Sequence, residues 1–444
     1  MANLSESDAM KVLLLNAHSP QNAGDLALLE QSLAHLQAAF PHADLSYVIN
    51  QPEPAAWLPA NVPYIRSIHE HKTNLIKDAP KPRRKWLMLG LAIWLVSISL
   101  IYRWTGLKLK PRASSAWREL LDHYFEADVT AAIGGGYLYA TKAFDLNYIW
   151  VWLGVALPVM MGKPLVLLPQ SFGPVTGKLN QLLLAWLVNR SVLAYAREER
   201  SQQYLYSIGV NQPVHVVPDV AFNCPTVEPA QAEAYLAEWW QPAKRPALLV
   251  GITAMDFGIQ HPGSGFSHGQ RYEQALLDLI QHISQRDDVH ILVFAQCVGA
   301  SEAEDDRVVA RRLLAQLPAE TPITFIDDRL QPAMLKQLYS QLDLLVATRL
   351  HSAIFALSSN TPSFVIGYLH KSAGVMQMLG LADYQIPIES IASANLISAF
   401  DQTVAARSLI KTLMRSTIPS LQSQLERLPS QIRAAVGDWL RGAK

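Results

Sequence analysis

Short apolar runs alternate with longer helical stretches along most of this 444-residue chain, and this alternation limits the possible folds. A first series of predicted strands comprises Lys11–Asn16, Asp128–Ile133, Pro164–Leu168, Val192–Ala196 and Val214–Val217. A second series comprises Ala247–Thr253, His290–Ala295, Ile323–Ile326, Leu342–Thr348 and Ser363–Tyr368. Strands that alternate with helices predict parallel sheets with helices on both faces. We therefore expect an α/β protein of two doubly wound Rossmann-like domains that face a cleft.

A polar, proline-containing stretch, residues 228–245, separates the two series and is interpreted as a linker region. This interpretation predicts an N-terminal domain over residues 1–227 and a C-terminal domain over residues 228–402. From residue 403 to the C-terminus the pattern is mostly helical, so we expect a helical segment over residues 403–444.

Composition excludes several classes of protein. Lys plus Arg and Asp plus Glu both number 37, which argues against a generally basic nucleic-acid binder. Half of the residues are hydrophobic, so a large core is available and global disorder is excluded. The only cysteines are Cys224 and Cys297, too few for a disulfide framework or a cysteine zinc site. His69 and His71 lack a third ligand at metal-binding spacing, so no metal is expected. Residues 1–10 lack the apolar core of a secretory signal, and we expect a cytoplasmic protein.

The strongest local feature is a predicted strand that runs directly into a helix at Thr348-Arg349-Leu350-His351-Ser352. Arginine offers a fork that fits a carboxylate or a phosphate, and histidine exchanges a proton near neutral pH. A helix N-terminus adds free N–H groups and partial positive charge. Together these residues predict a site for a small anion that also needs proton transfer.

Other predicted strands also end in loops with candidate binding residues, and each loop has a structural alternative. Asn22-Ala-Gly24-Asp25 precedes a helix and would favour an anion or a hydroxyl-rich ligand, or Asp25 simply caps the helix. Gly134, Gly135 and Gly136 expose backbone amides for a phosphate or sugar, or form a tight turn.

Three further side chains follow predicted strands. Gln170 lies in a turn-like segment, Pro169–Pro174. Arg197 ends an apolar strand and is either an anion ligand or a salt-bridged structural residue. Lys371 follows Gly367-Tyr368 and either contacts a phosphate or lies in a solvated loop.

Taken in order, these segments resemble the polysaccharide pyruvyl transferase family of bacterial exopolysaccharide clusters. The resemblance covers roughly residues 11–385. It rests on the following segments: Asn22-Ala-Gly-Asp25, Gly134–Gly136, Pro169-Gln-Ser-Phe-Gly-Pro174, Ala196-Arg-Glu198, Pro218-Asp219-Val-Ala-Phe222, Gly251-Ile-Thr-Ala-Met-Asp256, Thr348-Arg-Leu-His351 and Gly367-Tyr-Leu-His-Lys371.

The resemblance implies a GT-B-like fold and transfer of the pyruvyl group of phosphoenolpyruvate to a sugar, with ketal formation and release of phosphate. Phosphoenolpyruvate would be a co-substrate, and no cofactor is expected. The acceptor would be an exopolysaccharide sugar or a lipid-linked oligosaccharide.

The predicted site divides between the two domains. His351 is the expected general acid/base, with Arg349 as its catalytic partner. The expected donor-binding residues are Arg197, Arg349, Leu350, His351, Ser352 and Lys371. The expected acceptor-binding residues, on the N-terminal domain, are Asn22, Gly24, Asp25, Gly134, Gly135, Gly136 and Gln170.

Two other functions remain open: a GT-B glycosyltransferase that uses a nucleotide sugar, and a catalytically inert scaffold of polysaccharide assembly. No base-recognition signature supports the first. The presence of Arg349, His351 and Asp25 argues against the second.

Trp86–Tyr102 is an uncharged apolar run with basic residues on both sides, at the short edge of the length of a membrane span. It separates two parts of one predicted domain, so a single span would place them on opposite sides of the membrane. We expect shallow docking on the inner face of the membrane through residues 86–102, because tryptophan and tyrosine suit the interface. The alternatives are a core helix and a contact in a homo-oligomer.

Overall fold

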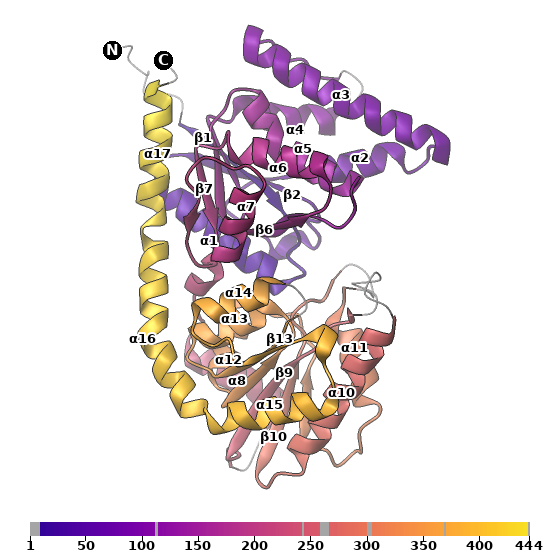
Figure 1. Ribbon diagram of the computed structural model, residues 1–444, viewed down its shortest axis with the longest axis vertical. Helices are drawn as coiled ribbons and strands as arrows, with labels where there is room; N and C mark the ends of the chain where they lie inside the picture. Colours follow the sequence, from indigo (N-terminus) through magenta and orange to yellow (C-terminus); the bar gives the residue numbers. More distant parts are fainter. Residues whose placement is uncertain are drawn as a thin grey trace. The chain divides into compact units, whose positions relative to one another are not determined.

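Two parallel sheets organise the chain (Figure 1). The computed structural model describes residues 9–111, 114–241, 244–257, 266–299, 304–367 and 370–442. The described residues form two compact units: those within 9–20, 28–220 and 424–442 form unit 1, and those within 21–27 and 221–423 form unit 2.

The sheet of unit 1 has the order β3-β2-β1-β4-β6-β7-β8, and β5 pairs with β6. Its strands are β1 (Lys11–Ala17), β2 (Asp44–Ile49), β3 (Tyr64–Arg66), β4 (Val129–Ala132), β5 (Gly135–Ala140), β6 (Leu165–Val175), β7 (Leu193–Ala196) and β8 (His215–Val216). Its helices are α2 (Ile68–Ile76), α3 (Lys81–Thr105), α4 (Ser115–Glu126), α5 (Leu146–Met160), α6 (Lys178–Val188), α7 (Glu199–Ser207), α17 (Leu428–Gly442) and most of α1 (Ala23–Ala39).

The sheet of unit 2 has the order β11-β10-β9-β12-β13-β14. Its strands are β9 (Leu248–Thr253), β10 (Val289–Phe294), β11 (Ile323–Ile326), β12 (Leu344–Ala347), β13 (Ser363–Gly367) and β14 (Gln385–Pro387). Its helices are α8 (Pro229–Trp239), α10 (Phe266–Ser284), α11 (Asp306–Leu314), α12 (Pro332–Ser340), α13 (Leu350–Ser358), α14 (His370–Met378), α15 (Ser393–Ala405) and most of α16 (Arg407–Glu426).

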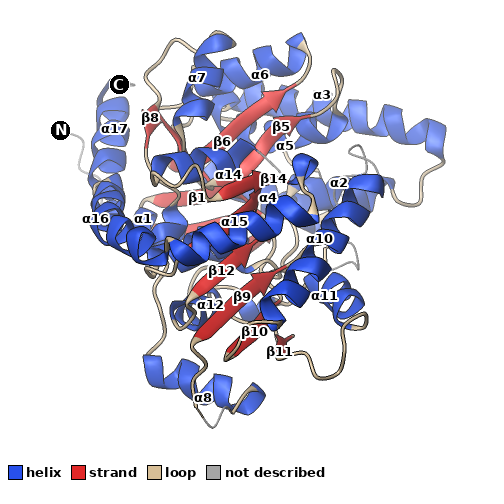
Figure 2. Cartoon of the chain, turned by 60° about the horizontal axis from the view of Figure 1, so that its bottom comes forward, coloured by secondary structure: helices blue, strands red, loops and turns tan. Residues whose placement is uncertain are grey.

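In each sheet the first strand is central. The next strands are added on one side of it and the later strands on the other side, which is the doubly wound Rossmann pattern. The reversal lies between β1 and β4 in unit 1 and between β9 and β12 in unit 2. All residues of β4, β9 and β12 are buried, because helices cover the sheets on both sides (Figure 2). The prediction of two Rossmann-like α/β domains is confirmed. Ligands of such sheets bind beyond the carboxyl ends of the strands at the reversal, and those ends define where to look for a site.

The structure differs from the predicted boundaries in three places. The units divide after Val220, and the predicted linker contains α8, which belongs to unit 2. The last residues, from Gln424 onward, belong to unit 1, where the Arg433 side chain donates to the carbonyl oxygen of Ala39 at 2.7 Å. Residues 21–27 belong to unit 2, although β1 before them lies in unit 1.

The predicted turn at Pro169–Pro174 is wrong, because β6 continues through it to Val175. Beyond its pairing with β4, this strand pairs with β5, which the sequence did not predict. In that ladder Gly135 lies opposite Gln170 and Leu138 lies opposite Phe172.

Candidate functional site

The junction between β12 and α13 is fixed by buried hydrogen bonds at the reversal of the unit 2 sheet. The Thr348 backbone N–H donates to Oγ1 of Thr253 at 3.2 Å, which ties the end of β12 to the end of β9. The hydroxyls of Thr348 and Tyr272 lie 2.9 Å apart. All three side chains are buried. These bonds fix the backbone of Thr348, and with it the start of the segment that contains Arg349 and His351.

A buried carboxylate holds Arg349. Nη2 of Arg349 donates to Oδ1 of Asp306 at 2.6 Å, and the two residues are 9% and 1% exposed. Oδ2 of Asp306 accepts the backbone N–H groups of Gln296 at 3.2 Å and of Cys297 at 2.8 Å. Burial acts to raise the pKa of Asp306, and the Arg349 charge with the two amides acts to lower it. Asp306 is thus a positioning residue for the arginine, and the sequence analysis did not identify it.

The first turn of α13 presents backbone N–H groups at the same place. Arg349 is the N-cap residue, and its side chain makes no capping hydrogen bond to the helix. Leu350, His351 and Ser352 form the first turn; Leu350 and Ser352 are buried, whereas His351 is partly exposed. Because uncapped N–H groups at a helix N-terminus favour an anion, the turn and the Arg349 guanidinium have the same charge preference.

Gln296, also missed by the sequence analysis, lies beside this turn. Its Oε1 accepts from the hydroxyl of Tyr339 at 2.9 Å and from the hydroxyl of Ser352 at 3.1 Å. Its Nε2 is buried and has no hydrogen-bond partner among the described residues. Buried amide nitrogens are normally satisfied, so an unpaired one next to α13 points to a missing acceptor.

The Asn22–Asp25 segment packs into this cluster within unit 2. Ala23 N–H donates to the carbonyl oxygen of Gln296 at 3.1 Å, and Asn22 pairs with Cys297 in an antiparallel bridge. A Cβ atom on Gly24 would lie 2.1 Å from Nδ1 of His351, so only glycine fits against that ring. The predicted location of Asn22, Gly24 and Asp25 on the N-terminal domain is therefore wrong: they belong with Arg349 and His351. Their role as sugar ligands stays a prediction.

The capping of α1 also differs from the alternative drawn from the sequence. Oδ1 of Asn22 accepts the backbone N–H of Gly24 at 2.9 Å, so Asn22 performs the capping. Asp25 lies inside the first turn of α1, where a carboxylate is favourable for the helix dipole.

In unit 1, the three glycines after β4 form neither of the two predicted alternatives, an open phosphate loop or a tight turn. A Cβ on Gly134 would lie 2.6 Å from the carbonyl oxygen of Pro169, and Gly135 has a φ of 126°. Gly135 and Gly136 lie inside β5, so they are part of a strand and not of an open phosphate loop. Their role in binding an acceptor stays a prediction.

Gln170 is fully buried at the same end of the unit 1 sheet. Its amide lies beside the hydroxyl of Tyr137 and has no hydrogen bond of normal geometry to the described residues. Its role in acceptor binding likewise stays a prediction.

Of the two alternatives for Arg197, an anion ligand or a salt-bridged structural residue, the structure has the second. Its Nη1 lies 2.5 Å from Oδ2 of Asp219, and its Nε donates to the Ser171 hydroxyl at 2.7 Å. The Glu198 carboxylate lies 3.6 Å from the guanidinium and accepts from Ser171 at 2.9 Å. All four residues are at most 2% exposed. The prediction that Arg197 clamps the donor is not supported, because two buried carboxylates surround its charge.

This network explains three of the segments that carried the family resemblance. Ser171, the Arg197-Glu198 pair and Asp219 come from separate motifs along the chain and meet in the interior of unit 1. A buried ion pair of this kind requires both partners, since loss of one leaves an uncompensated charge.

Lys371 is the second residue of α14, the helix that follows β13 in unit 2, and it is partly exposed. Tyr368 and Leu369, which precede it in the predicted motif, lie outside the described residues. Among the side chains that the structure describes, no group of three or more His, Cys, Asp or Glu residues could hold a metal ion.

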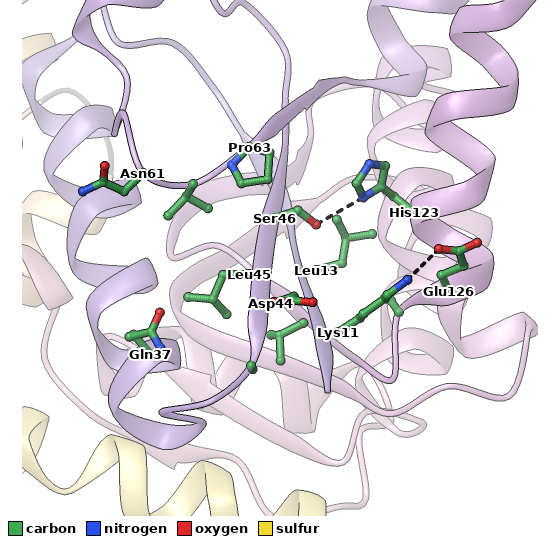
Figure 3. Close-up of a pocket in the computed structure, with 14 residues that line it drawn as sticks. Lys11, Leu13, Gln37, Asp44, Leu45, Ser46, Asn61, Pro63, His123 and Glu126 are labelled. Atoms are coloured by element: carbon green, nitrogen blue, oxygen red, sulfur yellow. Dashed lines mark hydrogen bonds and ion pairs between the residues drawn. The ribbon is translucent and has the colours of Figure 1, made fainter. Parts of the chain in front are cut away.

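A cavity of about 430 Å³ lies at the opposite end of the unit 1 sheet, where β1 and β2 begin (Figure 3). Its polar lining is internally paired: Lys11 contacts Glu126 at 2.8 Å, and the Ser46 hydroxyl lies 3.3 Å from Nδ1 of His123. Because doubly wound sheets bind ligands at the carboxyl ends of their strands, this cavity is not the preferred site.

Sequence comparison with known proteins identifies a family and a relative, and structural comparison identifies proteins of similar fold. A family model described as polysaccharide pyruvyl transferase matches residues 22–370. The chain is 24% identical over 396 residues to the amylovoran biosynthesis protein AmsJ of Erwinia amylovora, covering 88% of this chain and 91% of AmsJ.

Solved structures show the fold alone. The chain is similar to Anabaena Alr3699/HepE in complex with UDP-glucose, with a TM-score of 0.55, 15% identity, and coverage of 97% of this chain and 100% of that one. It is also similar to a sucrose-phosphate synthase from Thermosynechococcus elongatus, with a TM-score of 0.54, 11% identity, and coverage of 98% and 100%. The matched region of the family model includes the whole Arg349–His351 cluster.

Proposed function

Because the chain belongs to the polysaccharide pyruvyl transferase family, we propose that it transfers the pyruvyl group of phosphoenolpyruvate to a sugar, forming a ketal and releasing phosphate. The sugar belongs to an exopolysaccharide or to a lipid-linked oligosaccharide. The relative AmsJ is named for the biosynthesis of amylovoran.

The observation that carries the proposal is the cluster at the β12–α13 junction. Asp306 holds Arg349 in place at 2.6 Å, at a helix N-terminus that the Arg349 side chain itself does not cap. Nε2 of Gln296 is buried beside it without a described partner. Phosphoenolpyruvate carries a phosphate and a carboxylate, so it offers acceptors for several such donors at once.

His351 is the proposed acid/base because it is the partly exposed titratable side chain of the first turn of α13. In the proposed reaction it donates a proton to the methylene carbon of phosphoenolpyruvate, which makes the neighbouring carbon electrophilic. A sugar hydroxyl forms a bond to that carbon, its proton returns to His351, and the carbon–oxygen bond to phosphate breaks. The second hydroxyl then bonds to the same carbon and closes the ketal, and its proton leaves with the phosphate. One phosphate is released for each pyruvyl group transferred.

The other residues of the cluster position this chemistry. Gly24 leaves room for the His351 ring, and Asp306 fixes Arg349. Asn22 and Asp25 lie in the same cluster, so in this proposal they meet the acceptor next to the reacting carbon and not on a separate domain.

The direct test incubates the purified protein with radiolabelled phosphoenolpyruvate and a lipid-linked glycan extract of an exopolysaccharide producer. The expected result is label in the glycan together with an equal amount of free phosphate. His351→Gln should lower the rate by about 10²–10⁴ without loss of folding, since a positioned proton donor is worth that much. His42→Gln, an exposed histidine of unit 1, is the matched control and should leave the rate unchanged.

The competing donor is a nucleotide sugar, because the similar Anabaena structure contains UDP-glucose. A parallel incubation with UDP-glucose labelled in the sugar separates the two. Transfer of glucose and not of pyruvate would overturn the proposal.

A further inference from the structure

Helix α3 has apolar residues on the side that faces away from unit 1 as well as on the side that packs against it. On the packed side, Leu95 and Ile98 are at most 2% exposed, and the Tyr102 hydroxyl donates to the carbonyl oxygen of Phe125 at 3.0 Å. The Trp94 and Trp117 rings meet edge to face, with centroids 6.5 Å apart. These contacts, made by residues 94–102 of α3 to α4, and further contacts with α5 hold the helix along the surface of unit 1 (Figure 1).

The outer side presents an apolar stripe, interrupted by Gly90 and Ser97. Its members recur at intervals of three, four and seven residues: Trp86 (74% exposed), Leu89 (50%), Ile93 (58%), Leu100 (42%) and Trp104 (82%). Within the described residues, Arg83–Thr105 is the one helix long and apolar enough to cross a membrane, but only 17% of its most apolar window is buried. A core helix would be mostly buried, and a surface helix of a water-facing domain normally has a polar outer side.

A single membrane crossing by α3 is excluded by the sheet. β1 precedes the helix and β4 follows it, and they pair directly, with Val12 opposite Val129 and Leu15 opposite Ala132. One crossing would separate two hydrogen-bonded neighbours. The stripe can meet a membrane only from one side, with the helix lying in the plane of the interface.

The segment that carries the stripe contains basic residues and no acidic ones. No Asp or Glu occurs between Ala79 and Arg118, whereas this stretch contains nine Lys and Arg residues in a chain of zero net charge. Arg83, Lys85 and Arg103 are exposed and form no ion pair with a described residue. Lys108 and Lys110, beyond the helix, alternate with exposed Leu107 and Leu109, but they pair with Glu126 and Asp122, so the unpaired charge lies on the helix itself. Residues Arg112 and Ala113 lie outside the described residues.

We propose that the outer side of α3 docks on an anionic phospholipid bilayer, with Trp86 and Trp104 in the interface and the flanking Lys and Arg residues on lipid phosphates. Tryptophan is favoured at that depth, and basic residues are attracted by anionic headgroups. A second copy of the chain fits less well: in a twofold contact each α3 would place its basic ends against basic ends, because both ends carry the same charge. This proposal does not depend on the transfer reaction.

Vesicle flotation of the purified full chain tests the proposal. We expect the protein to float with vesicles of phosphatidylcholine and phosphatidylglycerol, less with phosphatidylcholine alone, and less when high salt screens the charges. The variant Trp86→Ser/Trp104→Ser should lower the partition coefficient by about tenfold or more, because both side chains are largely exposed and lose their apolar transfer to the interface. Leu409→Ser, 66% exposed on α16 in unit 2, is the matched control and should float like the wild type.

Circular dichroism and the urea midpoint confirm that each variant is folded. Absence of wild-type binding to anionic vesicles would overturn the proposal, as would binding that the tryptophan substitutions leave unchanged. A wild-type dimer in sedimentation equilibrium that the same substitutions dissociate, with no vesicle binding, would assign the surface to a second copy instead.

Discussion

A methyl group added at Gly24 is expected to displace the ring of His351. The new Cβ would lie 2.1 Å from Nδ1, 2.5 Å from Cγ and 2.7 Å from Cβ of His351, whereas ordinary contacts begin at 3.4 Å. The ring must therefore move by more than about 1 Å. Overpacking of this kind costs about 1–3 kcal/mol of folding free energy. A misplacement of about 1 Å at a catalytic group costs about 100-fold in rate.

A double-mutant cycle measures this contact without any substrate. The four proteins are the wild type, Gly24→Ala, His351→Gly and the double variant, and the free energy of unfolding is measured in urea. His351→Gly is chosen because it removes all three of the contacted atoms, including Cβ. The cost of about 1 kcal/mol for glycine in a helix is common to both backgrounds and cancels.

We expect Gly24→Ala to destabilise the wild type by about 1–3 kcal/mol and to cost much less when residue 351 is glycine. The control is Gly90→Ala, which meets no atom within 4 Å and should show no coupling to His351. If the effects of Gly24→Ala and His351→Gly on the free energy of unfolding add within about 0.5 kcal/mol, the packing of the first turn of α1 on the histidine is refuted.

Three other predictions concern charge. Asp306→Asn should destabilise by about 3–5 kcal/mol in urea, because Arg349 would keep a buried charge without its carboxylate; Asp438→Asn, in a pair whose side chains are both 75% exposed, should change stability by less than about 1 kcal/mol. Arg349→Lys should weaken phosphoenolpyruvate binding at least about tenfold in calorimetry, since lysine keeps the charge but loses the planar fork. Burial raises the pKa of Glu30 from 4.5 to about 7, so its folded form retains the proton and the stability this contributes is lost as pH rises from about 4.5 through 7. Glu30→Gln should accordingly stabilise the protein more at pH ~8 than at pH ~5, by up to about 3 kcal/mol; an equal effect at both pH values would contradict the assignment.

The sequence predicted the strands whose side chains are buried on both faces. β9, β10 and β12 read as uninterrupted apolar runs because helices cover both sides of the sheet, and their predicted positions agree with the structure to within a few residues. It missed β2 (Asp44–Ile49), which starts with an aspartate, β3 and β14, which have three residues each, and β5, which starts with two glycines. Such strands exist through pairing with a neighbour, and local pattern does not record that pairing.

Only part of the candidate site was predicted, because the sequence pattern does not record contacts between distant segments. Arg349 and His351 are close in sequence and follow a clear strand, so their position could be inferred. Asp306 and Gln296 reach the same place from other loops, with no distinguishing motif, and only the folded chain brings them together. The assignment of Asn22–Asp25 to the N-terminal domain was wrong because sequence continuity with β1 suggested it, whereas its hydrogen bonds are to the loop after β10.

Arg197 shows the limit of reasoning from residue type. A strand-terminal arginine in a family motif suggested an anion ligand, yet Asp219, 22 positions later, already neutralises it inside unit 1. Whether an arginine binds a ligand or a neighbouring carboxylate depends on tertiary contacts that composition does not contain.

The most direct test of the central claim is the stability of the purified protein in phosphoenolpyruvate compared with UDP-glucose, for the wild type and Arg349→Ala. A ligand at 100 times its dissociation constant should stabilise the folded state by about 2.7 kcal/mol. We predict stabilisation of the wild type by phosphoenolpyruvate and none of Arg349→Ala. Stabilisation by UDP-glucose and not by phosphoenolpyruvate, or equal stabilisation of both proteins by phosphoenolpyruvate, would contradict the assignment of the Arg349–His351 cluster as the donor site.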